Sequence, residues 1–267
     1  MKKLLFTVFC TACMCLSCNR SSNKQEEVDE LLIYCGITMV NPIKELAEIF
    51  EKENNCSVTI TQGGSEDLYQ SLKFSHFGEL YLPGSESYRE KHFEDGLLKD
   101  YIYLGYNQAS LIVQKGNPKN IPADINVLKN EQYLTVIGNP DSCSIGKQSK
   151  KILQKQGIYD TVLDHAVLIA SDSRTMNKTL HEKMTDVILN WGATAFFKEN
   201  KDAMDRLKLD ETIAPKKHLL LNLLSFARNK ELAKKFMLFA ASTRGQEVFQ
   251  KYGFLDSVSE PGEIQTQ

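Results

Sequence analysis

Three short turns in this sequence place a hydroxyl residue directly before a segment with helical periodicity. Thr38 follows the apolar run 31–35, Ser65 follows two glycines, and Ser144 begins the run Ser144-Ile145-Gly146. A helix N-terminus carries unpaired N–H groups and the positive end of the helix dipole, so it binds anions without a charged side chain. Together the turns predict an anion site, although each hydroxyl by itself also fits an ordinary helix cap.

The same sequence contains few patterns that indicate catalysis. There is no HExxH zinc helix, no GxSxG turn and no P-loop, and none of the five histidines has a ligand partner four residues on, so no metal site is expected. The Glu66-Asp67 pair and the Cys143 thiol are the groups able to do acid–base or nucleophilic chemistry. Carboxylates at such positions more often complement a helix start. We therefore expect a binding protein without a cofactor, and keep a thiol-dependent enzyme as an alternative.

Short apolar strands alternate with helical patterns along the body of the chain, which predicts crossover units and an α/β fold with mainly parallel sheets. In such sheets the turns after the carboxyl ends of strands converge on one crevice. We expect strands at 31–35, 57–61, 80–82, 110–114, 133–137, 166–170 and 187–189. Helices are expected from Pro42 with Asn41 as cap, after Ser65, at 145–156, at 175–184 and at 245–252 with Ser242 or Thr243 as cap.

No low-complexity linker divides the chain, so we expect two lobes joined by crossing segments rather than two separate domains. The crossings are expected near residues 103–108 and 215–219. Lobe 1 would then comprise residues 30–105 and 219–262, and lobe 2 residues 106–218, with a ligand cleft between them.

The first residues predict export from the cytoplasm. Lys2 and Lys3 precede an apolar stretch that is too short to span a membrane, and the chain turns polar directly after Cys18. We expect residues 1–17 to be a lipoprotein signal peptide, Cys18 to carry the lipid, and residues 18–29 to be a flexible tether. The protein would then be periplasmic or otherwise extracytoplasmic and membrane-anchored; a plain secreted protein is the alternative.

Composition agrees with a soluble globular domain that does not bind nucleic acid. The chain has 267 residues, 42% of them hydrophobic, with 32 basic against 34 acidic residues. A nucleic-acid-binding protein usually carries a basic excess or stripe. Outside the signal segment there are three cysteines, Cys35, Cys56 and Cys143, which is no disulfide framework. We expect reduced, partly buried thiols, with one pair as the alternative.

Several segments in this order resemble the periplasmic molybdate-binding proteins, which are type II solute-binding proteins of ABC transporters. The resemblance covers most of residues 30–256. It lies in Cys35-Gly36-Ile37-Thr38-Met39, Val58-Thr59-Ile60, Gly63 to Leu68, Asn139 to Gly146, Thr175-Met176, Asp186 to Trp191, and Asn229 to Phe254.

The resemblance implies a two-lobed clamshell that closes on a tetrahedral oxyanion such as molybdate or tungstate. By position, Thr38 and Ser65 would donate through hydroxyl and backbone groups, and Ile145 and Met176 through backbone N–H groups. Trp191 occupies the place of a ligand-facing Tyr. The expected partners are the small anion and an ABC permease, with the lipid anchor at the membrane, and we expect a monomer.

Departures from the family pattern leave the ligand open. Glu66 and Asp67 stand where the family commonly has small or basic residues, and they would oppose a dianion if they faced the cleft. Cys35 and Cys143 are both expected near the cleft. Another oxyanion, an organic anion or a metal species are therefore alternative ligands, and a ligand sensor is an alternative role.

Overall fold

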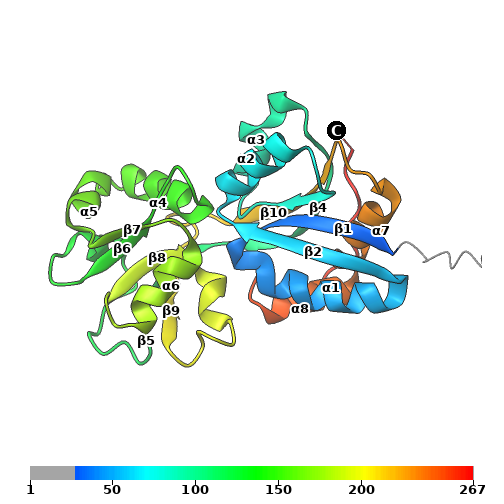
Figure 1. The fold of residues 1–267 in the computed structure, drawn as a ribbon. Helices are drawn as coiled ribbons and strands as arrows, with labels where there is room; N and C mark the ends of the chain where they lie inside the picture. Colours follow the sequence, from blue (N-terminus) through cyan, green and yellow to red (C-terminus); the bar gives the residue numbers. More distant parts are fainter. Residues whose placement is uncertain (1–27, 267) are drawn as a thin grey trace, which may run out of the picture.

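The computed structural model describes residues 28–266, which form two lobes side by side (Figure 1). The expected signal peptide, the lipidation site Cys18 and all but the last two residues of the expected tether lie outside the described residues. Within residues 28–266 no helix is both long and apolar enough to cross a membrane.

Lobe 1 is built on a five-stranded sheet in the order β2-β1-β3-β10-β4. Helices α1, α7 and α8 pack on one face of this sheet and α2 and α3 on the other (Figure 1). The strands are β1 (Asp29–Gly36), β2 (Cys56–Gly63), β3 (Leu80–Leu82), β4 (Leu98–Asn107) and β10 (Lys217–Leu224). The helices are α1 (Val40–Asn54), α2 (Ser65–Ser75), α3 (Ser87–Lys91), α7 (Lys230–Ala240) and α8 (Thr243–Lys251), with the short turns η1 (Ile37–Met39) and η2 (Phe93–Asp95).

Strand β1 shows why both faces of this sheet are covered. Leu31 and Ile33 point into one apolar core with α1, α7 and α8, whereas Tyr34 points into a second core with α2 and α3. Successive strand residues face opposite sides of a sheet, so a continuous apolar run requires helices on both.

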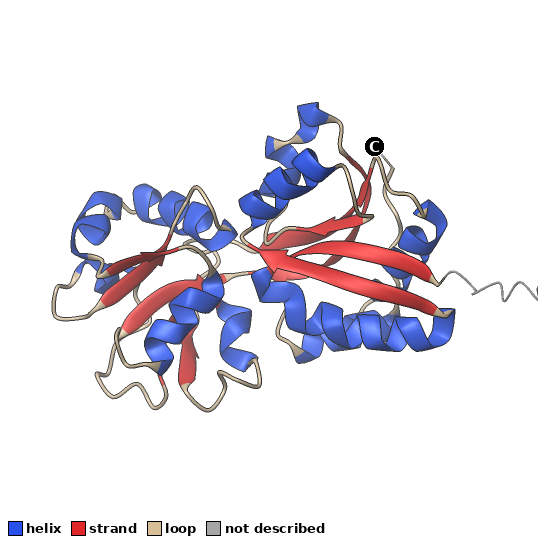
Figure 2. Cartoon of the chain, viewed as in Figure 1, coloured by secondary structure: helices blue, strands red, loops and turns tan. Residues whose placement is uncertain are grey.

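Lobe 2 repeats the plan with the order β7-β6-β8-β5-β9. Its strands are β5 (Ala109–Gln114), β6 (Thr135–Gly138), β7 (Leu168–Ala170), β8 (Val187–Trp191) and β9 (Met204–Leu207). Its helices are α4 (Ser144–Lys155), α5 (Tyr159–His165) and α6 (Ser173–His181), with η3 (Ile125–Lys129) and η4 (Gly192–Phe196) as short turns. Figure 2 shows helices on both sides of each sheet, as the α/β expectation requires.

Each sheet is mixed, but four of its five strands run in the same direction, as the expectation of mainly parallel sheets requires. The three strands β2, β1 and β3 are parallel, as are β7, β6 and β8, but β10 and β4 in lobe 1 and β5 and β9 in lobe 2 pair antiparallel. The one reversed strand is β10 in lobe 1 and β5 in lobe 2, and each is the first strand after the chain has crossed from the other lobe.

The chain passes between the lobes twice. β4 ends at Asn107 and β5 begins at Ala109, and the return runs from residue 208 to residue 216. The side-chain amide of Gln108 donates to the carbonyl of Ala214 at 3.0 Å, so the two crossings are tied together. The sheets thus change at 107–109 and at 217, two residues away from the expected lobe limits.

Two helix starts differ from expectation and one agrees. Helix α1 begins at Val40 after Met39, and Asn41 is no cap; its amide donates instead to Glu199 of lobe 2. Helix α6 begins at Ser173, two residues early, because the Asp172 carboxylate accepts from the N–H groups of Arg174 and Thr175. Ser242 caps α8 as predicted, accepting from the Gly245 N–H.

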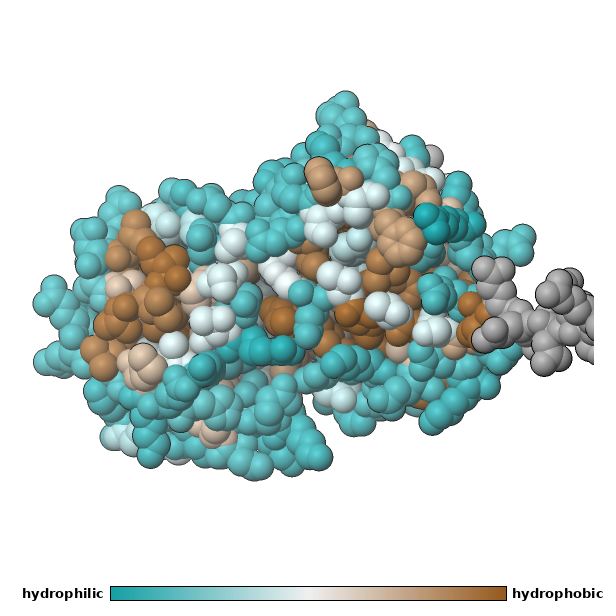
Figure 3. All heavy atoms as spheres, viewed as in Figure 1, coloured by the Kyte–Doolittle hydropathy of each residue, from teal (hydrophilic) through white to brown (hydrophobic). Residues whose placement is uncertain are grey.

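The free sheet edges of the two lobes differ in character. β7 leaves Val167, Leu168 and Ile169 between 40% and 52% exposed, whereas β2 presents Thr59 and Thr61. Figure 3 shows hydrophobic side chains gathered on lobe 2 in this view.

Candidate functional site

A small cavity lies where the two lobes meet. Its volume is about 10 Å³, close to the space that one ordered water requires. Eight residues of lobe 1 and three of lobe 2 line it: Gly36, Ile37, Thr38, Met39, Gly63, Gly64, Ser65 and Gly84, then Cys143, Ser144 and Ser173. We call it the inner cavity. Its walls come from the turns after β1, β2, β3, β6 and β7, which are the carboxyl ends of the parallel strands.

The hydroxyl of Ser65 is oriented by lobe 1. Ser65 is the first residue of α2, it is 2% exposed, and its Oγ accepts from the Gly84 N–H at 3.0 Å. A backbone N–H can only donate, so the Ser65 hydroxyl proton is left to donate elsewhere. The Ser65 carbonyl is fixed in turn by the Tyr81 hydroxyl at 2.7 Å.

Lobe 2 orients Ser144 in the same manner. Ser144 is the first residue of α4, and its Oγ accepts from the indole Nε1–H of Trp191 at 3.1 Å. Because an indole N–H is a donor only, the Ser144 hydroxyl is also free to donate. Thr38 and Ser173 complete the set, with the Thr38 hydroxyl donating across the lobe boundary to Ser173 Oγ at 3.3 Å.

The cavity wall contains no side chain that carries a full charge at neutral pH. Gly64 and Cys143 precede α2 and α4, and no side chain of residues 28–266 caps either helix, so both N-termini keep unpaired N–H groups. Burial raises the pKa of the Cys143 thiol to about 12, and the thiol donates to the Asn139 carbonyl at 3.3 Å. The site therefore offers neutral donors and helix dipoles, which is a setting for an anion.

Glycines of lobe 1 allow lobe 2 to approach this closely. A Cβ on Gly64 would lie 2.6 Å from the Ser142 carbonyl oxygen, and one on Gly84 would overlap Ser144 Oγ and lie 2.9 Å from its Cβ. Both pairs join the two lobes. Closure at the cavity therefore depends on the missing side chains at these two positions.

The acidic pair Glu66-Asp67 divides into two environments. Glu66 binds Lys91 at 2.8 Å and His92 at 3.2 Å, and these bonds lower the pKa of its carboxyl despite partial burial. Partial desolvation, followed by the charges of Glu66 and Asp172, raises the pKa of the Asp67 carboxyl. Asp172 belongs to lobe 2, so Asp67 and Asp172 repel each other across the lobe boundary.

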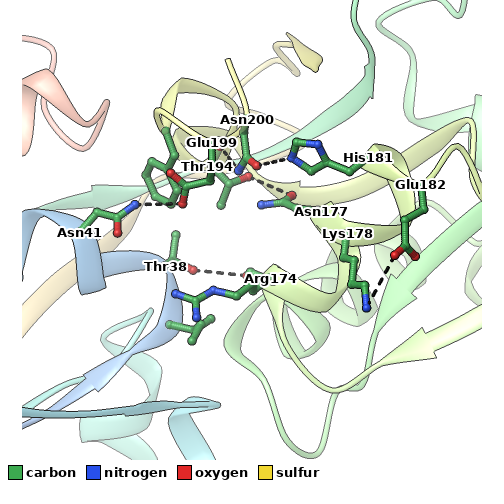
Figure 4. Close-up of a pocket in the computed structure, with 13 residues that line it drawn as sticks. Thr38, Asn41, Arg174, Asn177, Lys178, His181, Glu182, Thr194, Glu199 and Asn200 are labelled. Atoms are coloured by element: carbon green, nitrogen blue, oxygen red, sulfur yellow. Dashed lines mark hydrogen bonds and ion pairs between the residues drawn. The ribbon is translucent and has the colours of Figure 1, made fainter. Parts of the chain in front are cut away.

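A larger pocket of about 370 Å³ adjoins the inner cavity, and we call it the outer pocket (Figure 4). Ile37, Thr38 and Ser173 line both spaces. The rest of its wall comes from the start of α1, from α6 and from the segment 194–200. These lining residues are Asn41, Arg174, Asn177, Lys178, His181, Glu182, Thr194, Phe197, Glu199 and Asn200.

The five residues expected at the site are not all brought to the cavity wall. Thr38 and Ser65 line it, and Trp191 stands behind Ser144 as its hydrogen-bond donor. Ile145 follows Ser144 in the first turn of α4, where backbone N–H groups lack helical partners. The N–H of Met176 already donates to the Asp172 carbonyl at 3.2 Å. The roles of all five in ligand binding stay predictions.

Sequence reasoning missed Ser173 and Gly84. Ser173 directly follows Asp172, and an Asp before a helical pattern is a common N-cap that places the true helix start two residues before Thr175. Gly84 follows β3 in the run Pro83-Gly84-Ser85, and nothing in that run signals contact with a residue 60 positions later.

The three described cysteines are free and buried. Cys143 lines the inner cavity, as expected, but Cys35 does not. Cys35 belongs to the apolar core beneath β1, where burial raises the pKa of its thiol far above the ordinary value. Neither thiol is held as a reactive thiolate.

Comparison with known proteins identifies similar chains. The family model of bacterial extracellular solute-binding proteins matches residues 31–255. YvgL of Bacillus subtilis, whose name marks it as a candidate substrate-binding lipoprotein of an ABC transporter, is 24% identical over 251 residues, covering 93% of this chain and 94% of YvgL. The molybdate-binding protein ModA of Rhodobacter capsulatus is 21% identical over 232 residues, covering 85% and 88%.

The fold is shared with a solved periplasmic thiamin-binding protein at a TM-score of 0.73 and 15% identity, over 88% of this chain and 85% of that one. The names of ModA and of the thiamin-binding protein give different ligands. The two-lobed arrangement is therefore common to binders of unlike solutes, and the ligand must be argued from the site.

Proposed function

Because this chain belongs to the family of bacterial extracellular solute-binding proteins, we propose that it is the ligand receptor of an ABC importer and that it holds a tetrahedral oxyanion in the inner cavity. The family places its action outside the cytoplasm, and its members bind solutes rather than transform them. The observation that carries the ligand class is the pair of serines, Ser65 and Ser144. Each accepts from a donor-only partner, so its own proton stays free to donate to an anion in the cavity.

Neutral donors suit an anion in a closed cleft for a physical reason. Preorganised hydroxyl and N–H groups stabilise the charge without the desolvation cost of a buried counter-ion. Selection among anions then depends on the size of the cavity and the placement of donors. Because the inner cavity has only about the space of one water, the lobes must separate to admit a tetrahedral head group.

Molybdate and tungstate are the first ligands we propose. The support is the resemblance of the binding turns to the molybdate-binding proteins and the similarity to a curated molybdate-binding relative. The thiamin-binding neighbour shows that the fold also serves organic solutes, so the ligand must be tested directly.

We further propose that Cys18 carries a lipid that anchors the receptor to the membrane, after removal of residues 1–17. The sequence pattern around Cys18 supports this, as does the lipoprotein in the name of the Bacillus subtilis relative. Labelled palmitate incorporated by the wild-type chain, and lost in Cys18→Ala, is the expected result. Equal labelling of the two would contradict it.

The ligand is tested by a thermal-shift panel on residues 19–267 with molybdate, tungstate, sulfate and phosphate. A ligand at about a thousand times its dissociation constant stabilises the folded state by roughly 4 kcal/mol, which for a chain of this size raises the melting temperature by about 10 °C. Sedimentation of the same sample tests the expected monomer. No shift with any tetrahedral anion would contradict the proposed ligand class.

A further inference from the structure

The outer pocket presents one amide whose orientation is fixed by its neighbours. The backbone N–H of Trp191 donates to Asn190 Oδ1 at 2.8 Å. The side-chain amide nitrogen of Asn190 is therefore left to donate, and it donates to Asn177 Oδ1 at 2.8 Å. The Thr194 hydroxyl approaches the same Asn177 oxygen at 3.4 Å. Asn177 cannot be reversed without breaking this chain of hydrogen bonds.

The consequence is a free donor in the pocket wall. Asn177 is 6% exposed, and among residues 28–266 its amide nitrogen has no hydrogen-bond partner. It lines the outer pocket on α6, beside Arg174 and one turn before His181 (Figure 4). The nitrogen is open to the pocket, so an acceptor brought here by a ligand can complete its hydrogen bonding.

Hydrogen bonds also fix the segment 194–200, which forms another wall of the outer pocket. The Asn200 amide donates to the Thr194 carbonyl at 2.7 Å, so Asn200 Oδ1 accepts from His181 Nε2 at 2.7 Å. Glu199 accepts from the Asn41 amide at 3.1 Å and joins this segment to lobe 1. The pocket is thus a built space between the lobes, and its volume lies within the range of small-molecule sites.

The outer pocket is separated from the inner cavity by a single hydrogen bond. Thr38 and Ser173 line both spaces, and the bond between their hydroxyls is 3.3 Å long. A ligand that spans the boundary would replace this bond with contacts to each hydroxyl. A molecule that occupies both spaces must therefore open the contact between Thr38 and Ser173.

We propose that the outer pocket is a second subsite for the same ligand, and that it takes the organic substituent of a monosubstituted oxyanion through an acceptor group on that substituent. Asn177 and Arg174 donate to the acceptor, while the tetrahedral head group occupies the inner cavity. This inference rests on the proposed function, because it assumes the oxyanion head. It adds that a substituted phosphonate or phosphate ester with a carboxylate or carbonyl binds more tightly than the same head group without one.

Two phosphonates with the same head group test the proposal by titration calorimetry. Phosphonoacetate carries a carboxylate and methylphosphonate carries none. We expect phosphonoacetate to bind at least about tenfold more tightly, which corresponds to one charge-assisted hydrogen bond. Equal affinities, or tighter binding of methylphosphonate, would overturn the second subsite.

The variant Asn177→Asp gives the matched measurement. Aspartate keeps an oxygen for the Asn190 donor but replaces the free N–H₂ with a negatively charged acceptor. We expect it to abolish the preference for phosphonoacetate, while Gln132→Glu, which adds the same charge at an exposed position of lobe 2, preserves it. If Asn177→Asp does not fold, Arg174→Gln replaces it and should reduce the preference. An unchanged preference in the folded variant overturns the proposal.

Molybdate is included in each titration to separate the two hypotheses. Binding of molybdate with no binding of either phosphonate overturns the second subsite and leaves the oxyanion receptor standing. Binding of no tetrahedral anion at all overturns the proposed function and the subsite with it.

Discussion

The two lobes contribute unlike parts to one cavity. Lobe 1 supplies eight lining residues, four of them glycines, whereas lobe 2 supplies Cys143, Ser144 and Ser173 from the starts of two helices. The glycine-rich turns of lobe 1 therefore line the cavity largely with backbone atoms, and lobe 2 packs three side chains against them. The same α/β plan has been specialised at its turns alone, because the sheets beneath are alike in order and pairing.

Adding a side chain at a glycine of the lobe 1 turns should produce the largest loss of ligand affinity. In Gly84→Ala the new methyl group would overlap Ser144, which belongs to the other lobe, so the lobes cannot close while each still folds. We expect ligand affinity to fall about 100-fold, equivalent to roughly 3 kcal/mol, with a melting temperature close to that of the wild type without ligand.

Calorimetry and thermal unfolding measure the two quantities. Gly63→Ala is the matched control, since its Cβ would meet only Leu68 at 3.6 Å, in the same lobe. If the two variants lose affinity equally, the glycines do not act by admitting lobe 2.

Removing one oriented hydroxyl from each lobe tests whether the two lobes contribute equally to ligand binding. Ser65→Ala and Ser144→Ala each delete a donor whose partner fixes it, and we expect each to weaken binding by about 1–3 kcal/mol. Loss in Ser65→Ala alone would assign the ligand to lobe 1. Full affinity in both variants, measured by calorimetry, would disprove the site.

The indole of Trp191 should matter less than the hydroxyl that it orients. Trp191→Phe keeps the ring in the core of lobe 2 but removes the Nε1–H bond to Ser144. We expect affinity to fall by about tenfold or less, the value of one ordinary hydrogen bond. An effect larger than that of Ser144→Ala would show that Trp191 acts by another route, and the calorimetric comparison of the two variants decides this.

Charge across the lobe boundary should give a small gain of affinity. The pKa of Asp67 is raised by desolvation first, then by the charges of Glu66 and Asp172; only the Asp172 contribution crosses the lobe boundary, so through it closure is favoured below this pKa and opposed as pH rises through it. Asp67→Asn should therefore strengthen anion binding a few-fold at pH 7. The gain should shrink in acid and at high salt, because Asp67 is exposed and screened. A gain that is constant with pH would exclude this repulsion as its cause.

The smallest effect on binding is expected at the edge of lobe 2. Ile169→Thr makes the exposed edge of β7 resemble the threonine-bearing edge of β2, and Ile169 is not among the residues that line the cavity. We expect unchanged affinity and less self-association at high concentration, since exposed apolar edge strands favour pairing between chains. Light scattering measures the association; more scattering from the variant would contradict this reading.

Local patterns predicted the elements but not their partners. The strand 80–82 and the helix starting at Ser65 were placed from sequence, because apolar runs and glycine turns are encoded within a few residues. The stretch 217–224 was not expected to be a strand, and neither were β4 and β9. Strands β4 and β9 alternate buried and partly exposed residues weakly, and their pairing with β10 and β5 comes from segments far away in the chain.

The sequence by itself determined the fold class and the three turns that carry the hydroxyl residues Thr38, Ser65 and Ser144. It also predicts an export signal. These depend on residues that are neighbours in the chain. Only the tertiary structure decided which protons those hydroxyls offer, that Ser173 completes the set, and that Gly64 and Gly84 admit lobe 2. The reason is that a hydrogen bond between Trp191 and Ser144, or a contact between Gly84 and Ser144, exists only once two lobes fold and meet.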